Sequence, residues 1–192
     1  MKNNVCWIDV VKYEDAGGGL KAIYDNVTSS DGNLDNLYQA FSLRPHIIKP
    51  ADDLYKAVLH NDDNALPKWF SELISTFVAI VTGCEYARSH HGANFVHLLG
   101  NEKKAESIIL SLEQDDLDQC GDEKEVCALR YVRKLCREPE NISFEDISLL
   151  SNMGWRDGEI LEIVQIVSTL SYFCRVINGV GISLAGDRIG LY

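Results

Sequence analysis

Apolar residues recur every three or four positions along most of the chain, which is the spacing that places side chains on one face of an α-helix. The strongest pattern covers residues 67–81, where Pro67 suits a first helical turn and Gly83 suits a helix end. A second helix is predicted over residues 84–99, ending at Gly100. Because only the break at Gly83 separates these two segments, we expect them to pack as antiparallel neighbours.

The same spacing predicts further helices on both sides of this central pair. They cover residues 20–27, 34–41, 50–59 with Pro50 in the first turn, 105–112, 126–136, 147–153 and a long segment from about 157. Ser143 is a candidate N-cap, and the acidic stretch 114–122 is predicted as a loop. No segment alternates apolar and polar residues over more than a few positions, as a half-buried strand does. The sequence therefore predicts an all-α protein with seven to nine helices.

Composition places the chain among ordinary globular domains. It has 192 residues, of which 46% are hydrophobic and 24% charged, so a single domain with a sizeable core is expected. Eighteen Lys and Arg against 29 Asp and Glu give a net charge of −11. This charge repels phosphate backbones and anionic lipid, so we expect no nucleic-acid partner and no membrane partner.

Two further features favour a cytoplasmic location. The most apolar stretch, residues 160–177, is interrupted by Glu162, Gln165 and Arg175, and is predicted to be a buried helix and not a membrane span. Charged residues occupy the N-terminal positions where a signal peptide would be apolar. In a reducing compartment cysteines are expected as free thiols, most of them in the core. The six cysteines are Cys6, Cys84, Cys120, Cys127, Cys136 and Cys174.

Three residues of the central pair form a candidate catalytic group. Cys84 and His91 are seven residues apart, two helical turns, and so lie on one helix face, while Glu72 belongs to the neighbouring helix. A cysteine at a helix start meets the positive end of the dipole and free N–H groups, which favour thiolate. The histidine can relay a proton and the carboxylate can orient it. The spacing alone favours a structural interpretation, with a core cysteine, a surface histidine and a solvated carboxylate.

A family resemblance favours the catalytic interpretation. Residues 66–99, LPKWFSELISTFVAIVTGCEYARSHHGANFVHLL, resemble the core of the alkylhydroperoxidase D and carboxymuconolactone decarboxylase family. Leu43–Arg44–Pro45, Leu54–Tyr55–Lys56–Ala57 and the ending 181–192 resemble its peroxidase-related branch. The resemblance implies an alkylhydroperoxidase D-like helical bundle, with one domain over 1–192. Its parts are an N-terminal helical arm (1–62), a core (63–180) and an apolar tail (181–192).

The resemblance also implies site residues. The family pattern is a Glu, eleven residues, and then Cys-x-x-Cys-x-x-x-His, which Glu72, Cys84 and His91 match as carboxylate, first cysteine and histidine. Tyr86 precedes the second cysteine position, where members often have His or Tyr, and is an accessory candidate. Ala87 occupies the second cysteine position itself. In peroxidase members that cysteine is proposed to attack the peroxide and the first to close a disulfide with it, so no local disulfide can form here.

Three functions remain open. The leading hypothesis is a thiol-dependent alkylhydroperoxide reductase-like, antioxidant oxidoreductase in which Cys84 acts on a peroxide. Its sulfenic acid then needs an external thiol donor or a distant cysteine, such as Cys174, although Cys174 is better explained as a core thiol. The second is a cofactor-free carboxymuconolactone decarboxylase-like lyase that uses His91 and Glu72 on an organic acid. The third is a catalytically silent oligomeric protein that binds a small molecule.

The remaining expectations concern cofactors and assembly. Neighbouring His90 and His91 point roughly 100° apart on a helix, so we expect no metal, and no cofactor motif is evident. Arg88, one turn after Cys84, could stabilise a thiolate or an anionic substrate, or could be a solvated arginine. The resemblance implies a homo-oligomer, commonly a trimer or hexamer, and the apolar tail would fit burial between subunits.

Overall fold

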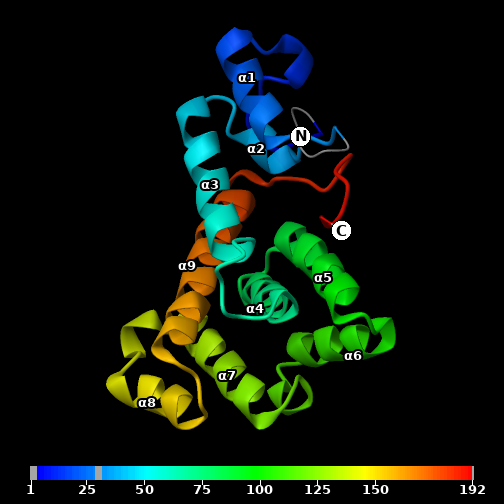
Figure 1. The fold of residues 1–192 in the computed structure, drawn as a ribbon. Helices are drawn as coiled ribbons and strands as arrows, with labels where there is room; N and C mark the ends of the chain where they lie inside the picture. The colour runs from blue at the N-terminus through cyan, green and yellow to red at the C-terminus, as the bar shows by residue number, and fades with distance from the viewer. Residues whose placement is uncertain (1–3, 29–31, 192) are drawn as a thin grey trace.

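A computed structural model describes residues 4–28 and 32–191, and in this part of the chain the regular structure is entirely helical (Figure 1). The all-α prediction is therefore confirmed, with nine α-helices and four short 3-10 turns in the described residues. The α-helices are α1 (Gly18–Val27), α2 (Asn36–Ala40), α3 (Ile48–Leu59), α4 (Lys68–Val81), α5 (Glu85–Leu99), α6 (Glu102–Glu113), α7 (Glu123–Arg137), α8 (Phe144–Asn152) and α9 (Asp157–Val180).

Helix α4 lies at the centre, in contact with α3, α5, α6, α7 and α9 (Figure 1). All ten residues from 70 to 79 are buried, as expected for a helix that is surrounded on every side. Two of its three buried hydroxyl side chains donate to carbonyls one turn earlier in the helix. Ser75 Oγ donates to the Ser71 carbonyl at 2.8 Å, and Thr76 Oγ1 donates to the Glu72 carbonyl at 2.7 Å.

Helix α9 packs along α4 and also contacts α3, α7 and α8. By length and composition alone it could cross a membrane, but half of its most apolar window is buried inside the fold. We therefore describe α9 as a core helix. Helix α8 begins as predicted after Ser143, whose backbone N–H donates to Asp146 Oδ2 at 2.8 Å in a capping box.

The predicted loop 114–122 contains one feature that the sequence pattern did not indicate. Residues Leu117–Gln119 form a 3-10 turn, and Leu117 and Cys120 are buried in the main core. These apolar side chains anchor the acidic segment against α6 and α7.

The N-terminal segment around residues 5–7 meets the first residues after α9, and the tail that follows lies beside the start of α5 (Figure 1). Trp7 N–H donates to the Val180 carbonyl at 2.9 Å, and Ser183 N–H donates to the Val5 carbonyl at 2.8 Å. Gly181 ends α9 with φ +63°, and a Cβ there would lie 2.1 Å from the Trp7 ring. Only glycine fits both this backbone conformation and this close approach.

The C-terminal tail then runs back along α5. Leu191 N–H donates to Asn94 Oδ1 at 2.7 Å, and Asp187 accepts from the backbone N–H of Asn36 at 3.0 Å. The segment that we expected between subunits therefore has contacts on its own chain.

Candidate active site

The turn between α4 and α5 sets the position of the candidate residues. Gly83 has φ +64°, a left-handed conformation that few other residues adopt, and it reverses the chain directly after α4. Cys84 follows as the N-cap of α5, and its N–H donates to the Ala79 carbonyl at 2.8 Å. The short turn packs α5 antiparallel to α4, so that the second turn of α5 faces the first half of α4.

The structure brings Glu72 and His91 into direct contact across this helix pair. His91 Nδ1 lies 2.6 Å from Glu72 Oε2, and both side chains are buried. Asn94, one turn further along α5, donates from Nδ2 to Glu72 Oε1 at 3.2 Å. With Nδ1–H donating to the carboxylate, the imidazole has a fixed orientation and tautomer, and Nε2 is the atom left to exchange a proton.

His91 lines a cavity of about 190 Å³ between α2, α3, α5 and α9. Most of its wall is apolar or aromatic. Polar groups also line it, and they come from α2, α3, α5 and the segment after α3. The apolar side includes Leu37, Tyr55, Leu170, Phe173 and Ile177, and the polar side includes Tyr38, His60, His90, His91 and Asn94. A small apolar pocket with a few converging polar groups is the usual form of a small-molecule site.

Two other histidines of this wall were missed as site residues by the sequence analysis. His60 and His90 each have a buried Nε2 without a hydrogen-bond partner in the described part of the chain. Burial lowers the pKa of His60, and burial together with the charge of His91 lowers the pKa of His90 to about 4. Both rings are therefore neutral at neutral pH. The ring of Tyr55 lies between two of the imidazoles, 5.0 Å from His60 and 6.1 Å from His91 between ring centroids.

Cys84 lies outside the cavity wall and is only 1% exposed. Its pKa is lowered chiefly by a hydrogen bond from the Cys174 thiol, with help from the Ala87 N–H and the charge of His91, while burial opposes the shift. The wall at this place is formed by Ala87. The position of the missing second cysteine therefore faces the cavity, and the remaining motif cysteine lies behind it.

The accessory candidates have different surroundings. Tyr86 lines the cavity, and its hydroxyl donates to Asp187 Oδ2 at 2.5 Å. Burial and the charge of Asp187 raise the pKa of Tyr86, so the phenol stays protonated. Arg88 lies outside the cavity and forms ion pairs with Glu113 and Glu85. The contribution of Asp187 was missed because it lies 101 residues from Tyr86 in the chain.

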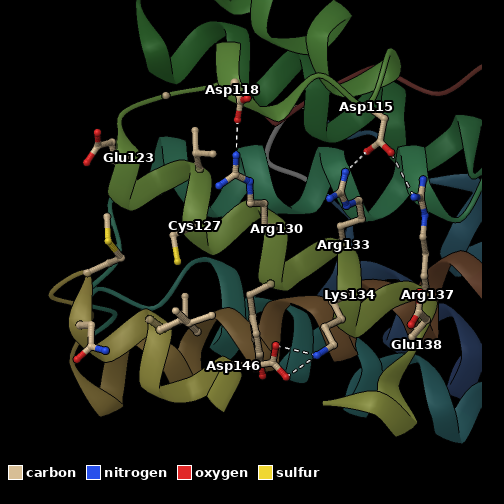
Figure 2. Close-up of a pocket in the computed structure, with 17 residues that line it drawn as sticks. Asp115, Asp118, Glu123, Cys127, Arg130, Arg133, Lys134, Arg137, Glu138 and Asp146 are labelled. Atoms are coloured by element: carbon tan, nitrogen blue, oxygen red, sulfur yellow. Dashed lines mark hydrogen bonds and ion pairs between the residues drawn. The ribbon is translucent and has the colours of Figure 1, made fainter. Parts of the chain in front are cut away.

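A larger groove, of about 1160 Å³, runs between α7 and α8 (Figure 2). None of the predicted site residues lines it. Its basic side chains are neutralised by neighbouring carboxylates, in the pairs Arg130–Asp118, Arg133–Asp115, Arg137–Asp115 and Lys134–Asp146. Among the described residues, no group of three or more His, Cys, Asp or Glu side chains is placed to hold a metal ion. The smaller cavity is therefore the better candidate for chemistry.

Solved structures share this arrangement of helices. A peroxidase-related protein from Ralstonia eutropha JMP134, described as an alkylhydroperoxidase AhpD core, superposes with a TM-score of 0.80 at 17% identity, covering 94% of this chain and 92% of that one. A peroxidase-related protein from Silicibacter sp. TM1040 gives 0.79 at 18% identity, with the same coverage. The chain has the AhpD-type fold. The family resemblance in the sequence is thereby confirmed at the level of the fold.

A third structure with this fold is an enzyme with a different described activity. The debrominase Bmp8, in a cysteine-to-alanine variant bound to 2,3,4-tribromopyrrole, matches with a TM-score of 0.72 at 17% identity, covering 95% of this chain and 92% of that one. No family model matches the sequence, and no curated protein matches it. AhpD-type folds thus occur in proteins described as peroxidase-related and in a debrominase, so the activity must be argued from the site.

Proposed function

We propose that this AhpD-type protein is a cofactor-free enzyme that transfers a proton to or from a small organic acid at His91, with Glu72 holding the imidazole. One observation carries the proposal. His91 lies in the cavity wall with Nδ1 fixed 2.6 Å from Glu72, whereas the neighbouring wall position, Ala87, has no thiol. The site thus retains the acid–base pair and lacks a sulfur on the cavity surface among the described residues.

The proposed chemistry follows from the surroundings of the imidazole. His91 Nε2 takes a proton from carbon, or returns one to a carbanion or enolate, while the Glu72 carboxylate stabilises the imidazolium that forms. The neutral imidazoles of His60 and His90 offer hydrogen bonds to the oxygens of the substrate without adding charge. A lyase of the carboxymuconolactone decarboxylase kind uses this type of chemistry on an organic acid.

A second candidate function is a thiol-dependent, antioxidant hydroperoxide reductase. The observation that favours it is the lowered pKa of Cys84, which increases the thiolate fraction available to attack a peroxide. The peroxidase-related description of two proteins with this fold agrees with it. This function requires the peroxide to pass the Ala87 wall and an external thiol donor to restore the enzyme.

Three variants distinguish these functions in two assays, one for decarboxylation of lactone acids and one for reduction of hydroperoxides by a dithiol. Acid–base catalysis predicts that His91→Ala lowers kcat/KM in the first assay by about 10²–10⁴-fold, while Cys84→Ser retains activity. Thiol chemistry predicts peroxide turnover that Cys84→Ser abolishes. Cys120→Ser, a buried cysteine outside the site, serves as the matched control.

If His91→Ala decarboxylates lactone acids at the same rate as the wild type, the proposed role of the imidazole is refuted. Absence of turnover in both assays, together with a ligand bound in the cavity, would favour the silent binding protein.

We further propose that the protein is a cytoplasmic homo-oligomer, a trimer or hexamer, without nucleic-acid or membrane partners. The net charge of −11 supports the absence of polyanionic partners. Light scattering coupled to size-exclusion chromatography measures the oligomeric state directly, and a monomer at micromolar concentration would contradict it.

A further inference from the structure

Two buried thiols meet behind the cavity wall. Cys84 begins α5 and Cys174 lies in α9, and both are at most 1% exposed. Both belong to the same buried apolar cluster, and their thiols are close enough to shift each other's pKa, although the two residues are 90 positions apart in the chain. Both cysteines are reduced in the structure. The packing of α9 against the turn before α5, where Asn178 Nδ2 donates to the Thr82 carbonyl at 3.2 Å, therefore creates a pair of thiols that the local motif lacks.

Part of the cavity wall belongs to the same apolar cluster as this pair. Ala87, Phe173 and Ile177 pack in the same apolar cluster as the two cysteines, and all three also line the cavity. Ala87 is the smallest of them. Of these three wall residues, Ala87 therefore obstructs a small molecule in the cavity least.

The surroundings of the two thiols shift their pKa values in opposite directions. A hydrogen bond from the Cys174 thiol, the Ala87 N–H and the charge of His91 lower the pKa of Cys84 against the effect of burial, which favours its thiolate. The same hydrogen bond and burial raise the pKa of Cys174, which stays protonated. Cys84 is therefore the nucleophile of the pair, and Cys174 is the thiol held beside it.

We propose that Cys84 and Cys174 form a redox pair in which a small hydroperoxide oxidises Cys84 and Cys174 closes an intramolecular disulfide. In the first step the Cys84 thiolate attacks the terminal peroxide oxygen, the O–O bond breaks, and the alkoxide or hydroxide that leaves takes a proton. Cys84 becomes a sulfenic acid. The Cys174 sulfur then attacks the Cys84 sulfur, an S–S bond forms, and the hydroxyl leaves as water with the Cys174 proton. A dithiol returns both cysteines to thiols.

This inference is independent of the proposed acid–base function, because a disulfide forms whether or not His91 turns over an organic acid. It rests on the second candidate function, the reaction of Cys84 with a peroxide, and adds the thiol that resolves it. Cys120, Cys136 and Cys6 do not combine a lowered pKa with a neighbouring thiol and a place beside the cavity wall. Cys120 donates to the Asp116 carbonyl at 3.5 Å, and burial raises its pKa to about 11. Burial likewise raises the pKa of Cys136 to about 11. Cys6 lies in the same apolar cluster as the pair, and its thiol donates to the Ile8 carbonyl at 3.4 Å.

Peptide mass spectrometry of the full-length protein after treatment with hydrogen peroxide tests the proposal. The wild type is expected to yield one dominant disulfide, between Cys84 and Cys174, which a dithiol reverses. Cys174→Ser should accumulate a dimedone adduct on Cys84 several-fold above wild type, because the sulfenic acid is no longer resolved. Cys6→Ser, in the same cluster, should form the disulfide as the wild type does.

Three results would overturn the proposal. One is a wild type in which Cys84 stays reduced, and another is direct oxidation of Cys84 to sulfinic acid at equal rates in wild type and Cys174→Ser. The third is a dominant disulfide that joins Cys174 to Cys136 or to Cys6. The wild-type measurement decides the matter even if a variant fails to fold, and decarboxylase activity of the reduced protein reports on the acid–base proposal separately.

Discussion

Acidification should destabilise the protein through the neutral histidines of the cavity, and His90 gives the clearest case. Its side chain is 15% exposed, it stacks on Tyr86 with ring centroids 4.6 Å apart, and its Nε2 has no hydrogen-bond partner in the described part of the chain. The folded protein holds this ring neutral, while the unfolded chain lets it take up a proton. Unfolding therefore becomes more favourable as the pH falls.

The size of the effect follows from the pKa. The pKa of His90 falls from the ordinary value of 6.5 to about 4, and one pKa unit corresponds to about 1.4 kcal/mol. Above pH 6.5 the ring is neutral in both states and contributes no pH dependence. Between pH 6.5 and 4 the folded state loses stability, by about 2 kcal/mol at pH 5 and about 3 kcal/mol in full. Asp187, whose carboxylate lies 4.0 Å from Nε2, acts in the opposite direction.

Urea unfolding of wild type and His90→Phe between pH 7.5 and 5 measures this contribution. Phenylalanine keeps the aromatic contact with Tyr86 but cannot bind a proton, so the loss of stability at pH 5 should be smaller in the variant by about 2 kcal/mol. Taking the difference between the two proteins cancels the contribution of the other titrating groups. His46→Phe, at an exposed position, controls for loss of an imidazole.

Equal pH dependence in wild type and His90→Phe would refute this reasoning. A smaller loss of stability in the wild type than in the variant would mean that attraction to Asp187 outweighs the burial of the ring.

Three further predictions concern the wall and its supports. Glu72→Gln keeps the shape of the side chain but removes the charge that faces His91. The free energy of unfolding in urea should fall by about 1–3 kcal/mol, and turnover should also fall. Unchanged stability would contradict the charge-assisted contact. Ala87→Cys places a thiol on the cavity wall, and this thiol should react with methyl methanethiosulfonate at least tenfold faster than Cys84 of the wild type. Equal rates would mean that reagents in the cavity do not reach position 87. Tyr86→Phe removes a donor to the buried Asp187 and should cost about 1–3 kcal/mol in urea unfolding, and an unaltered midpoint would contradict that contact.

Much of the fold was predictable because helical spacing is a local property. The burial of α4 and the turn at Gly83 follow from residues that are close together in the sequence, and the structure has both. Pairing of α4 with α5 follows from the short turn between them. These features need no knowledge of distant residues, since they depend on side-chain periodicity and backbone preference.

The candidate site was predictable only in part. The spacing and the family resemblance singled out Glu72 and His91, and the structure places them in contact. His60 lies just past the end of α3, and nothing in its local sequence indicates that α3 packs so as to turn this imidazole toward the cavity. Cys174 was interpreted as a core thiol, and its position near Cys84 depends on how α9 packs against the turn before α5.

The sequence alone thus determined the helices, the central pair and the absence of a second motif cysteine at Ala87, because each depends only on residues that are close together in the chain. Only the tertiary structure decided that Ala87 faces the cavity and Cys84 does not. It also decided which distant groups complete the wall. The physical reason is that cavity walls form where several helices meet, and their relative placement depends on packing of the whole core.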